Sequence, residues 1–195
     1  MAKPTKLSHY VLKSHQPHRL ADWYAALLDG DVVFRSGVLT LVTYDEEHHR
    51  IGFGGLPSGS TELDDQHENG RPGLSHVAFG YDSVEALLDC FEKARNRGDR
   101  PVVSIHHGLT ISLYYKDPDG NNVETFIDCF PTSEASMAYM RSPAFQKNPV
   151  GIPFDADKAL ANIKAGMNPK EATAFDTELE IDVMKLGHEI VVALG

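Results

Sequence analysis

The sequence has 195 residues, of which 42% are apolar, so the chain can bury a core of ordinary size. Its 28 acidic and 18 basic residues give a formal net charge of −10, which argues against binding to the phosphate backbone of nucleic acid or to an anionic membrane surface. The N-terminal stretch MAKPTKLSHY has no apolar signal segment, and no apolar run is long enough to span a membrane. We therefore expect a cytoplasmic protein with neither nucleic acid nor membrane among its partners.

A short repeat organises the first part of the chain. The run LSHYVL at 7–12 recurs as LSHVAF at 74–79, and each copy has a histidine at the third place of a strand-like apolar run. After each copy, apolar residues recur at helical spacing, over 18–28 and 83–96. A strand followed by an amphipathic helix is therefore predicted twice.

Three strand-like runs follow each predicted helix. They cover 31–34, 39–44 and 50–53 in the first copy, and 101–105, 110–115 and 122–127 in the second. The Gly-, Ser- and Asp-rich run 56–73 links the copies. We predict an α+β fold with one domain over 1–130, made of tandem βαβββ modules at about 6–56 and 73–130. A helix covers one face of each sheet, and the other faces curve around a central pocket.

Residues 131–195 differ in composition and are predicted to form a partly helical C-terminal extension. Four prolines between 131 and 153 indicate an irregular path at its start. A short helix is expected over 155–166 with Asp155 as its N-cap, and a longer one over 178–194. The longer helix has a narrow apolar stripe, formed by Leu179, Val183, Leu186, Ile190 and Leu194. Such a stripe suits packing on the same domain or on a second subunit, and we expect a homo-oligomer.

Three polar side chains in strand-like runs are candidate metal ligands. Glu124 follows the DPDG turn in an apolar run, and a buried carboxylate needs water, a cation or a metal. His9 and His76 occupy equivalent places in the repeat, so the three side chains can converge in one pocket. Two imidazoles and one carboxylate form the facial triad of non-haem Fe(II) oxygenases. The alternative is that each histidine is a hydrogen-bonded core residue.

The motifs GLSHVAF, HGLTISLYYKDPDGNNVETF and LSHYVL resemble the vicinal oxygen chelate superfamily, which includes glyoxalases, bleomycin resistance proteins and dioxygenases. Within it, residues 6–130 resemble the type I extradiol ring-cleavage dioxygenases. The pattern aromatic-x-D-P-x-G-N-x-x-E is the most specific part of the resemblance. By this resemblance His9, His76 and Glu124 occupy the three iron-ligand positions. The implied cofactor is Fe(II), and Mn(II) accepts the same ligands.

The resemblance also implies roles for three further residues. His49, the second histidine of a His-His pair before the fourth strand, matches the active-site acid–base. Tyr114 matches a tyrosine that hydrogen-bonds a metal-bound substrate hydroxyl. His107, in the context H-G-L, matches a histidine over the substrate pocket, with His106 as the alternative. Each has a structural alternative, namely a solvated loop pair for the histidines and a packed strand residue for the tyrosine.

The function implied by the resemblance is Fe(II)-dependent extradiol cleavage of a catechol-type aromatic ring. Its partners would be a small aromatic diol and O₂, and its setting the catabolism of aromatic hydrocarbons. A glyoxalase-like isomerase or transferase generally uses a second carboxylate in the last strand of the first repeat, which the run HRIGFG at 49–54 lacks. A non-catalytic module that binds drugs or other small molecules is the other alternative, and metal content would distinguish it.

Overall fold

A computed structural model describes residues 7–37, 39–55, 74–176, 179 and 181–194. The chain divides into two compact units. Unit 1 consists of Met1–Gln66 with Asp117–Asn121, and unit 2 of His67–Lys116 with Asn122–Gly195. The linker predicted at 56–73 lies outside the described residues.

Unit 1 contains the first βαβββ module. Its elements are β1 (Tyr10–Ser14), α1 (Pro17–Leu28), β2 (Asp31–Arg35), β3 (Leu39–Thr43) and β4 (Ile51–Gly55). The strand order is β1-β4-β3-β2, with β1 parallel to β4 and the other neighbours antiparallel. The predicted order of elements is confirmed. The first strand begins later than predicted, because its ladder starts at Tyr10 opposite Ile51, so that His9 lies directly before β1.

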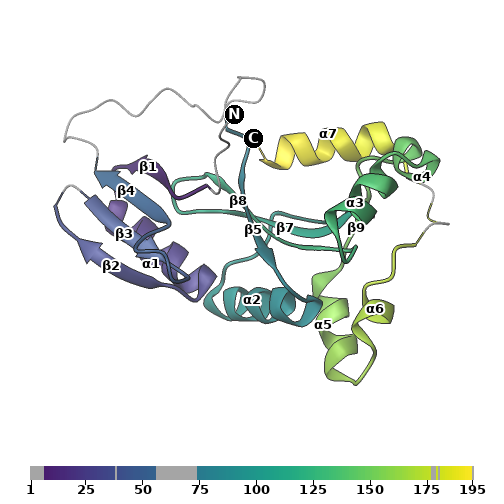
Figure 1. The fold of residues 1–195 in the computed structure, drawn as a ribbon, viewed down its shortest axis with the longest axis horizontal. Coiled ribbons are helices and arrows are strands. Elements are labelled where there is room, and N and C mark those ends of the chain that lie inside the picture. Colours follow the sequence, from purple (N-terminus) through teal and green to yellow (C-terminus); the bar gives the residue numbers. More distant parts are fainter. Residues whose placement is uncertain (1–6, 38, 56–73, 177–178, 180, 195) are drawn as a thin grey trace. The chain divides into compact units, whose positions relative to one another are not determined.

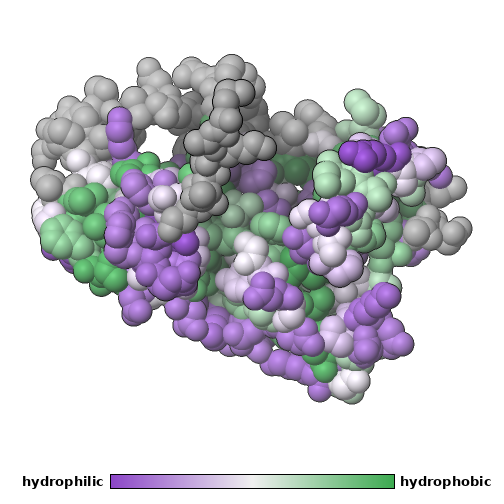
Figure 2. Space-filling view, viewed as in Figure 1, coloured by the Kyte–Doolittle hydropathy of each residue, from purple (hydrophilic) through white to green (hydrophobic). Residues whose placement is uncertain are grey.

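The core of unit 1 lies between α1 and its sheet. Leu20, Tyr24 and Leu27 of α1 are buried, and the Tyr24 ring lies 5.2 Å from the ring of Phe53 on β4. Apolar side chains also reach the surface of the strands, and Figure 2 shows apolar surface over β2 and β3. Val11 of β1, for example, is 53% exposed. Burial of apolar area against α1 therefore accounts for only one face of this sheet.

The DPDG turn predicted from the sequence belongs to unit 1. Asp117 accepts hydrogen bonds from the backbone N–H groups of Asp119 and Asn121, at 2.9 and 2.8 Å. The Tyr24 hydroxyl donates to the same carboxylate at 3.1 Å. Gly120 has a φ of 86°, the left-handed conformation that glycine adopts without steric cost. Burial raises the pKa of Asp117, and these hydrogen bonds oppose the rise.

Unit 2 contains the second βαβββ module and one further strand. The elements are β5 (Val77–Tyr81), α2 (Val84–Arg97), β6 (Val103–His106), β7 (Thr110–Lys116), β8 (Asn122–Asp128) and β9 (Ile152–Pro153). The strand order is β5-β8-β7-β6-β9, with β5 parallel to β8. The second copy of the repeat is confirmed. The sequence did not predict β9, because two residues are too few for a periodic pattern.

The helix α2 covers one face of the unit 2 sheet (Figure 1). Ser83 caps it by accepting from the N–H of Ala86 at 3.1 Å, and Gly98 ends it with a φ of 95°. The apolar face of α2 is buried and consists of Leu87, Leu88, Cys90, Phe91 and Ala94. Its outer face is hydrophilic (Figure 2), as amphipathic spacing requires.

The rest of unit 2 is the predominantly helical C-terminal extension. Its helices are α3 (Ser133–Met140), α4 (Pro143–Lys147), α5 (Ala156–Lys164), α6 (Pro169–Ala172) and α7 (Val183–Leu194). Asp155 caps α5 as predicted, accepting from the N–H of Lys158 at 2.8 Å. The last helix starts at Val183 rather than 178, because Asp182 accepts from the N–H of Lys185 and so caps it there. Leu179 therefore lies outside the helix. None of the helices in the described parts of the chain is long and apolar enough to cross a membrane.

Candidate metal centre and active site

The predicted site residues of unit 2 lie on the face of its sheet opposite α2. Tyr114 of β7 is paired with Glu124 of β8, so the two side chains share a face. The next residue of β7, Tyr115, points to the opposite face and lies near Cys90 of α2. That opposite face therefore packs against α2 in the core. In Figure 1, α2 and α7 lie on opposite sides of this sheet. The Glu124 face is therefore the α7 side.

Glu124 and His76 form the centre of this face. Nε2 of His76 lies 3.1 Å from Oε2 of Glu124, and Glu124 is only 8% exposed. Burial favours a raised pKa for Glu124, but hydrogen bonds from His76, Ser112 and Tyr114 bring the pKa below its usual value. The hydrogen bond to Glu124, opposed by burial, raises the pKa of His76. The buried carboxylate thus has an imidazole as its hydrogen-bond partner, as the place of Glu124 in an apolar strand requires.

The orientation of the His76 ring suits a metal ligand. Its Nδ1 lies 3.2 Å from the Ser75 hydroxyl, and its Nε2 faces Glu124. When Nδ1 carries the proton, the Nε2 lone pair points toward the carboxylate, and a cation between the two groups would be bound by both. The ladder between β5 and β8 begins at Val77, so His76 lies directly before its strand, as His9 does.

His107 and Tyr114 lie beside this pair. Nδ1 of His107 lies 2.6 Å from the carbonyl oxygen of Val150, which can only accept, so Nδ1 carries the hydrogen. Nε2 of the ring then faces the Tyr114 hydroxyl at 3.3 Å. Burial lowers the pKa of His107, which keeps the ring neutral. Burial and the Glu124 charge raise the pKa of Tyr114, which keeps the phenol protonated.

His106 has a different environment. Its Nδ1 accepts from the N–H of Gly108 at 3.0 Å, and its ring lies 4.9 Å from the ring of Phe175. Burial lowers its pKa to about 4. Of the two adjacent histidines, His107 is therefore the one that the structure brings to Tyr114.

The predicted site residues of unit 1 form a histidine cluster. The His9 and His49 ring centroids lie 4.6 Å apart, and the stacked His48 and His49 rings have a Nδ1–Nδ1 distance of 2.6 Å. Desolvation and the neighbouring His48 and His9 lower the pKa of His49. Because His49 is then neutral at pH 7, its ring can accept a proton.

Sequence reasoning missed the role of Arg50 in this cluster. Its Nη1 donates to the carbonyl oxygens of Leu7 and Ser8, at 3.2 and 3.1 Å. Its Nε donates to the Asp45 carboxylate at 2.9 Å. The Arg50 side chain thus holds the backbone that directly precedes His9. Arg50 itself directly follows His49 in the sequence. The run of acidic residues before the histidine pair was the only sequence signal for it.

The predicted ligands have donor atoms that suit a metal ion. In unit 2 the His76 imidazole contacts the Glu124 carboxylate, and unit 1 contains a further imidazole, that of His9. Among the described residues, neither unit by itself assembles three or more His, Cys, Asp or Glu side chains around a common point. The three-residue ligand set of His9, His76 and Glu124 stays a prediction.

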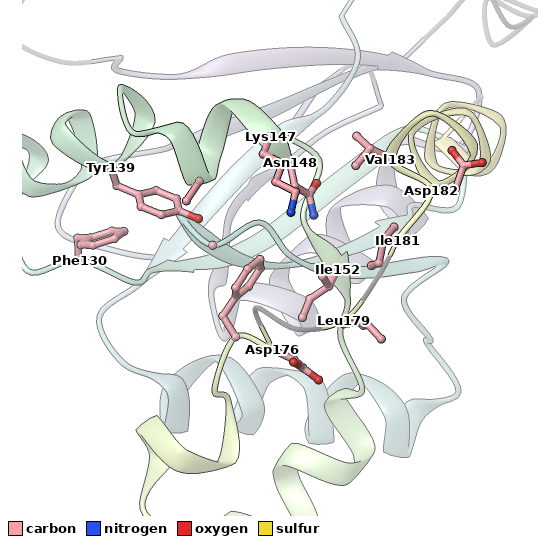
Figure 3. A pocket seen from close by; sticks show the side chains of 13 residues that line it. Phe130, Tyr139, Lys147, Asn148, Ile152, Asp176, Leu179, Ile181, Asp182 and Val183 are labelled. Carbon is pink, nitrogen blue, oxygen red and sulfur yellow. The ribbon is translucent and has the colours of Figure 1, made fainter.

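Unit 2 also has a cavity of about 1060 Å³ in its C-terminal extension. Figure 3 shows aromatic and aliphatic side chains around it, together with Lys147, Asn148, Asp176 and Asp182. Gly108, next to His107, is part of its wall, but none of the predicted metal or catalytic residues lines it. The sequence did not predict this cavity, since its lining comes from short irregular segments.

The tandem βαβββ units and their paired histidine and glutamate define a known class of protein. Residues 6–125 match the model of the Glyoxalase/Bleomycin resistance protein/Dioxygenase superfamily, and the chain belongs to this superfamily. Two relatives from Rhodococcus globerulus extend the match. Biphenyl-2,3-diol 1,2-dioxygenase 2 is 42% identical over 180 residues, covering 92% of this chain and 93% of the relative. Biphenyl-2,3-diol 1,2-dioxygenase 3 is 35% identical over 189 residues, covering 95% and 97%.

Solved structures agree with the fold. A glyoxylase/bleomycin resistance protein/dioxygenase domain from Frankia sp. EAN1pec has a TM-score of 0.55 at 20% identity, covering 67% of this chain and 96% of its own. A lactoylglutathione lyase from Agrobacterium tumefaciens has a TM-score of 0.50 at 17% identity, covering 65% and 96%. At such identities the likeness concerns the fold alone. The predicted superfamily is confirmed, and the names of the Rhodococcus relatives confirm the predicted dioxygenase class.

Proposed function

We propose that this protein is a metal-dependent extradiol dioxygenase that opens the ring of a catechol-type aromatic diol with O₂. The observation that carries the proposal is the contact between His76 and Glu124 on a buried sheet face, beside Tyr114 and His107. The similarity to two enzymes named biphenyl-2,3-diol 1,2-dioxygenase, over more than nine-tenths of the chain, supports it. An aryl-substituted catechol is accordingly the first substrate to test.

The proposed ligands are His9, His76 and Glu124, and the proposed metal is Fe(II), with Mn(II) as the alternative. When bound, the metal supplies open coordination positions for the diol oxygens and O₂ and passes electron density between them. Two neutral imidazoles and one carboxylate leave it with a net charge of +1, which favours a diol bound as its anion. Ser75 would hold the His76 ring with Nε2 toward the metal.

The other proposed site residues act on protons and orientation. His49, neutral at pH 7 because desolvation and its histidine neighbours lower its pKa, would accept a proton from a diol hydroxyl as substrate binds. The protonated Tyr114 phenol would donate a hydrogen bond to a substrate oxygen. His107, whose ring is oriented by the Val150 carbonyl, would present Nε2 as an acceptor on the same face.

The isomerase alternative has less support. Glyoxalase-like enzymes generally need a second carboxylate from the last strand of the first module, but β4 has the sequence IGFGG. A non-catalytic binding module would have no use for a buried carboxylate paired with an imidazole.

The domain organisation, cellular location and oligomeric state of the protein are also proposals. We propose one catalytic domain over 1–130 with an extension over 131–195, acting in the cytoplasm as a homo-oligomer. Self-association would bury exposed apolar side chains such as Phe34 and Met184, which are 49% and 83% exposed. Light scattering coupled to gel filtration measures the assembly directly, and a monomer at micromolar concentration contradicts it.

The decisive test is anaerobic loading with Fe(II), then exposure to O₂ with a panel of catechols that includes biphenyl-2,3-diol. We expect a coloured ring-opened product and the uptake of one O₂ per diol consumed. Glu85→Gln, a change on the exposed part of α2, is the control and should behave as the parent does. Stoichiometric iron without consumption of any diol would contradict the dioxygenase proposal.

A further inference from the structure

Asn122, two residues before Glu124, connects three segments of unit 2. Its side-chain Nδ2 donates one hydrogen to the carbonyl oxygen of Ser75 at 2.8 Å and the other to the carbonyl oxygen of Leu194 at 2.6 Å. The residue is only 8% exposed. The donors of this buried amide are fully used, and its Oδ1 has no hydrogen-bond partner among the described residues. The two acceptors therefore determine how the amide is oriented.

The contact with Ser75 lies where the backbone ladder stops. The first backbone pair of β5 and β8 is Val77 with Val123, and continuing that register by one residue would bring His76 opposite Asn122. Among the described residues, no ladder hydrogen bond holds 74–76, because the ladder begins at Val77. The Asn122 amide extends the ladder by one bond, on the carbonyl that directly precedes His76. The position of the His76 backbone relative to Glu124 thus depends on this side chain.

The contact with Leu194 brings in the C-terminal helix. The last carbonyl groups of a helix lack intrahelical partners and carry the negative end of its dipole. Here the Leu194 carbonyl accepts from Asn122 and also from the Lys116 ammonium at 2.6 Å. Lys116 and Asn122 are opposite each other on β7 and β8, so the end of α7 is held across these two strands. Docking of α7 therefore fixes the rotamer of Asn122.

We propose that Asn122 is a positioning residue for the metal ligand His76, and that the C-terminal end of α7 holds it in place. This inference rests on the proposed function, because it concerns the same metal centre. Asn122 is not one of the proposed ligands or catalytic residues, and its two side-chain hydrogen bonds go to the Ser75 and Leu194 carbonyls. It acts through the Ser75 carbonyl and thereby keeps the His76 imidazole close enough to Glu124 for both to bind one metal ion. Loss of an outer partner of a metal ligand typically lowers metal affinity by about 10- to 100-fold.

The test is the metal affinity of Asn122→Asp, measured anaerobically with Fe(II) and with Mn(II) against a competing chelator. The change is isosteric but sets carboxylate oxygens against two carbonyl oxygens, so we expect the dissociation constant to rise about 10- to 100-fold. Hydrogen exchange of the amides at 74–77 should accelerate in the metal-free variant. Asn96→Asp, the same change at an exposed position of α2, should alter neither quantity.

A second control separates positioning from general loss of stability. Val123→Ala removes buried methyl groups from the adjacent residue, on the α2 face of the same strand, and lowers Tm without touching the amide. We expect it to leave the metal dissociation constant unchanged. Equal effects of Val123→Ala and Asn122→Asp on that constant would overturn the proposal.

The part played by α7 is tested by deleting residues 183–195. The deletion alone should weaken metal binding, and Asn122→Asp should cost less in the shortened chain than in the full one, since the two changes act on one contact. Strictly additive effects would overturn the link to α7. If the parent protein binds neither metal, the proposed function fails. If the parent binds metal as tightly as Asn122→Asp does, only this inference fails.

Discussion

Nε2 of His76 lies 3.1 Å from Oε2 of Glu124, on the sheet face that α2 does not cover. Glu124 lies in β8 and His76 directly before β5, so the two residues are far apart in sequence while their strands are neighbours in the sheet. Their hydrogen bond lowers the pKa of Glu124 and raises that of His76, so the contact favours a protonated imidazole beside an ionised carboxylate. A cation bound between the two side chains would replace this direct contact. Glu124, as the anionic partner, is therefore the first residue to substitute.

Glu124→Gln should abolish high-affinity metal binding. The change keeps the shape of the side chain but removes the negative charge and one of the proposed ligands, so the dissociation constant for Fe(II) should rise by at least about 100-fold. Anaerobic titration against a chelator measures it. A dissociation constant equal to that of the parent would exclude Glu124 as a ligand, whatever the activity.

Tyr114→Phe should affect turnover more than metal binding. Loss of a hydrogen bond to a charged substrate oxygen costs about 1.5–3 kcal/mol, or roughly 10- to 100-fold in kcat/KM. The neighbouring Tyr115→Phe is a matched control, because that hydroxyl lies on the α2 side of the sheet, away from Glu124. Similar rates for both variants would show that Tyr114 is a packing residue.

His49→Gln should change the pH profile of the reaction as well as its rate. If neutral His49 accepts a substrate proton, kcat/KM of the parent falls at acidic pH with an apparent pKa below 6.5, because desolvation and the nearby histidines lower the pKa of this ring. The variant should lose this acid limb and about 100-fold or more in rate. In His48→Gln the limb should survive and move to higher pH, since one lowering influence is gone. An unaltered profile in His49→Gln would rule out the proposed base.

His106 should make the protein less stable in acid. Burial lowers its pKa to about 4 in the folded state, whereas the unfolded chain takes up the proton near pH 6.5. Its contribution is therefore fully present above pH 6.5 and is lost as the pH falls toward 4, by up to about 3 kcal/mol, because each tenfold difference in proton affinity corresponds to about 1.4 kcal/mol. Urea unfolding across this range measures the slope. His106→Gln should flatten it, and an unchanged slope would assign the acid sensitivity to other groups.

The sequence predicted the tandem modules because each strand and helix has its own apolar period, and because the LSH runs mark equivalent strands. It predicted that Glu124 needs a partner because a buried strand carboxylate is costly, and His76 is a partner in the structure. The role of Glu124 as a metal ligand stays a prediction. It could not predict the bonds of Arg50 or Asn122, since a side chain that holds a distant backbone carbonyl leaves no periodic trace. Nor could it predict α3, α4, α6 and β9, because these elements are too short for their residue patterns to differ from those of a loop.

The place of the turn Asp117–Asn121 in unit 1 has a consequence for how the chain can be divided. The first repeat ends near residue 56, yet the Tyr24 hydroxyl within it bonds to Asp117, which the second repeat encodes. A fragment that stops at the linker would lose the Asp117 carboxylate that accepts from Tyr24, and the remaining fragment would lose the Tyr24 hydroxyl that donates to its turn. The two halves are repeats in sequence but not separable modules. Co-expressed fragments should therefore complement each other, while either one alone should be insoluble or unfolded.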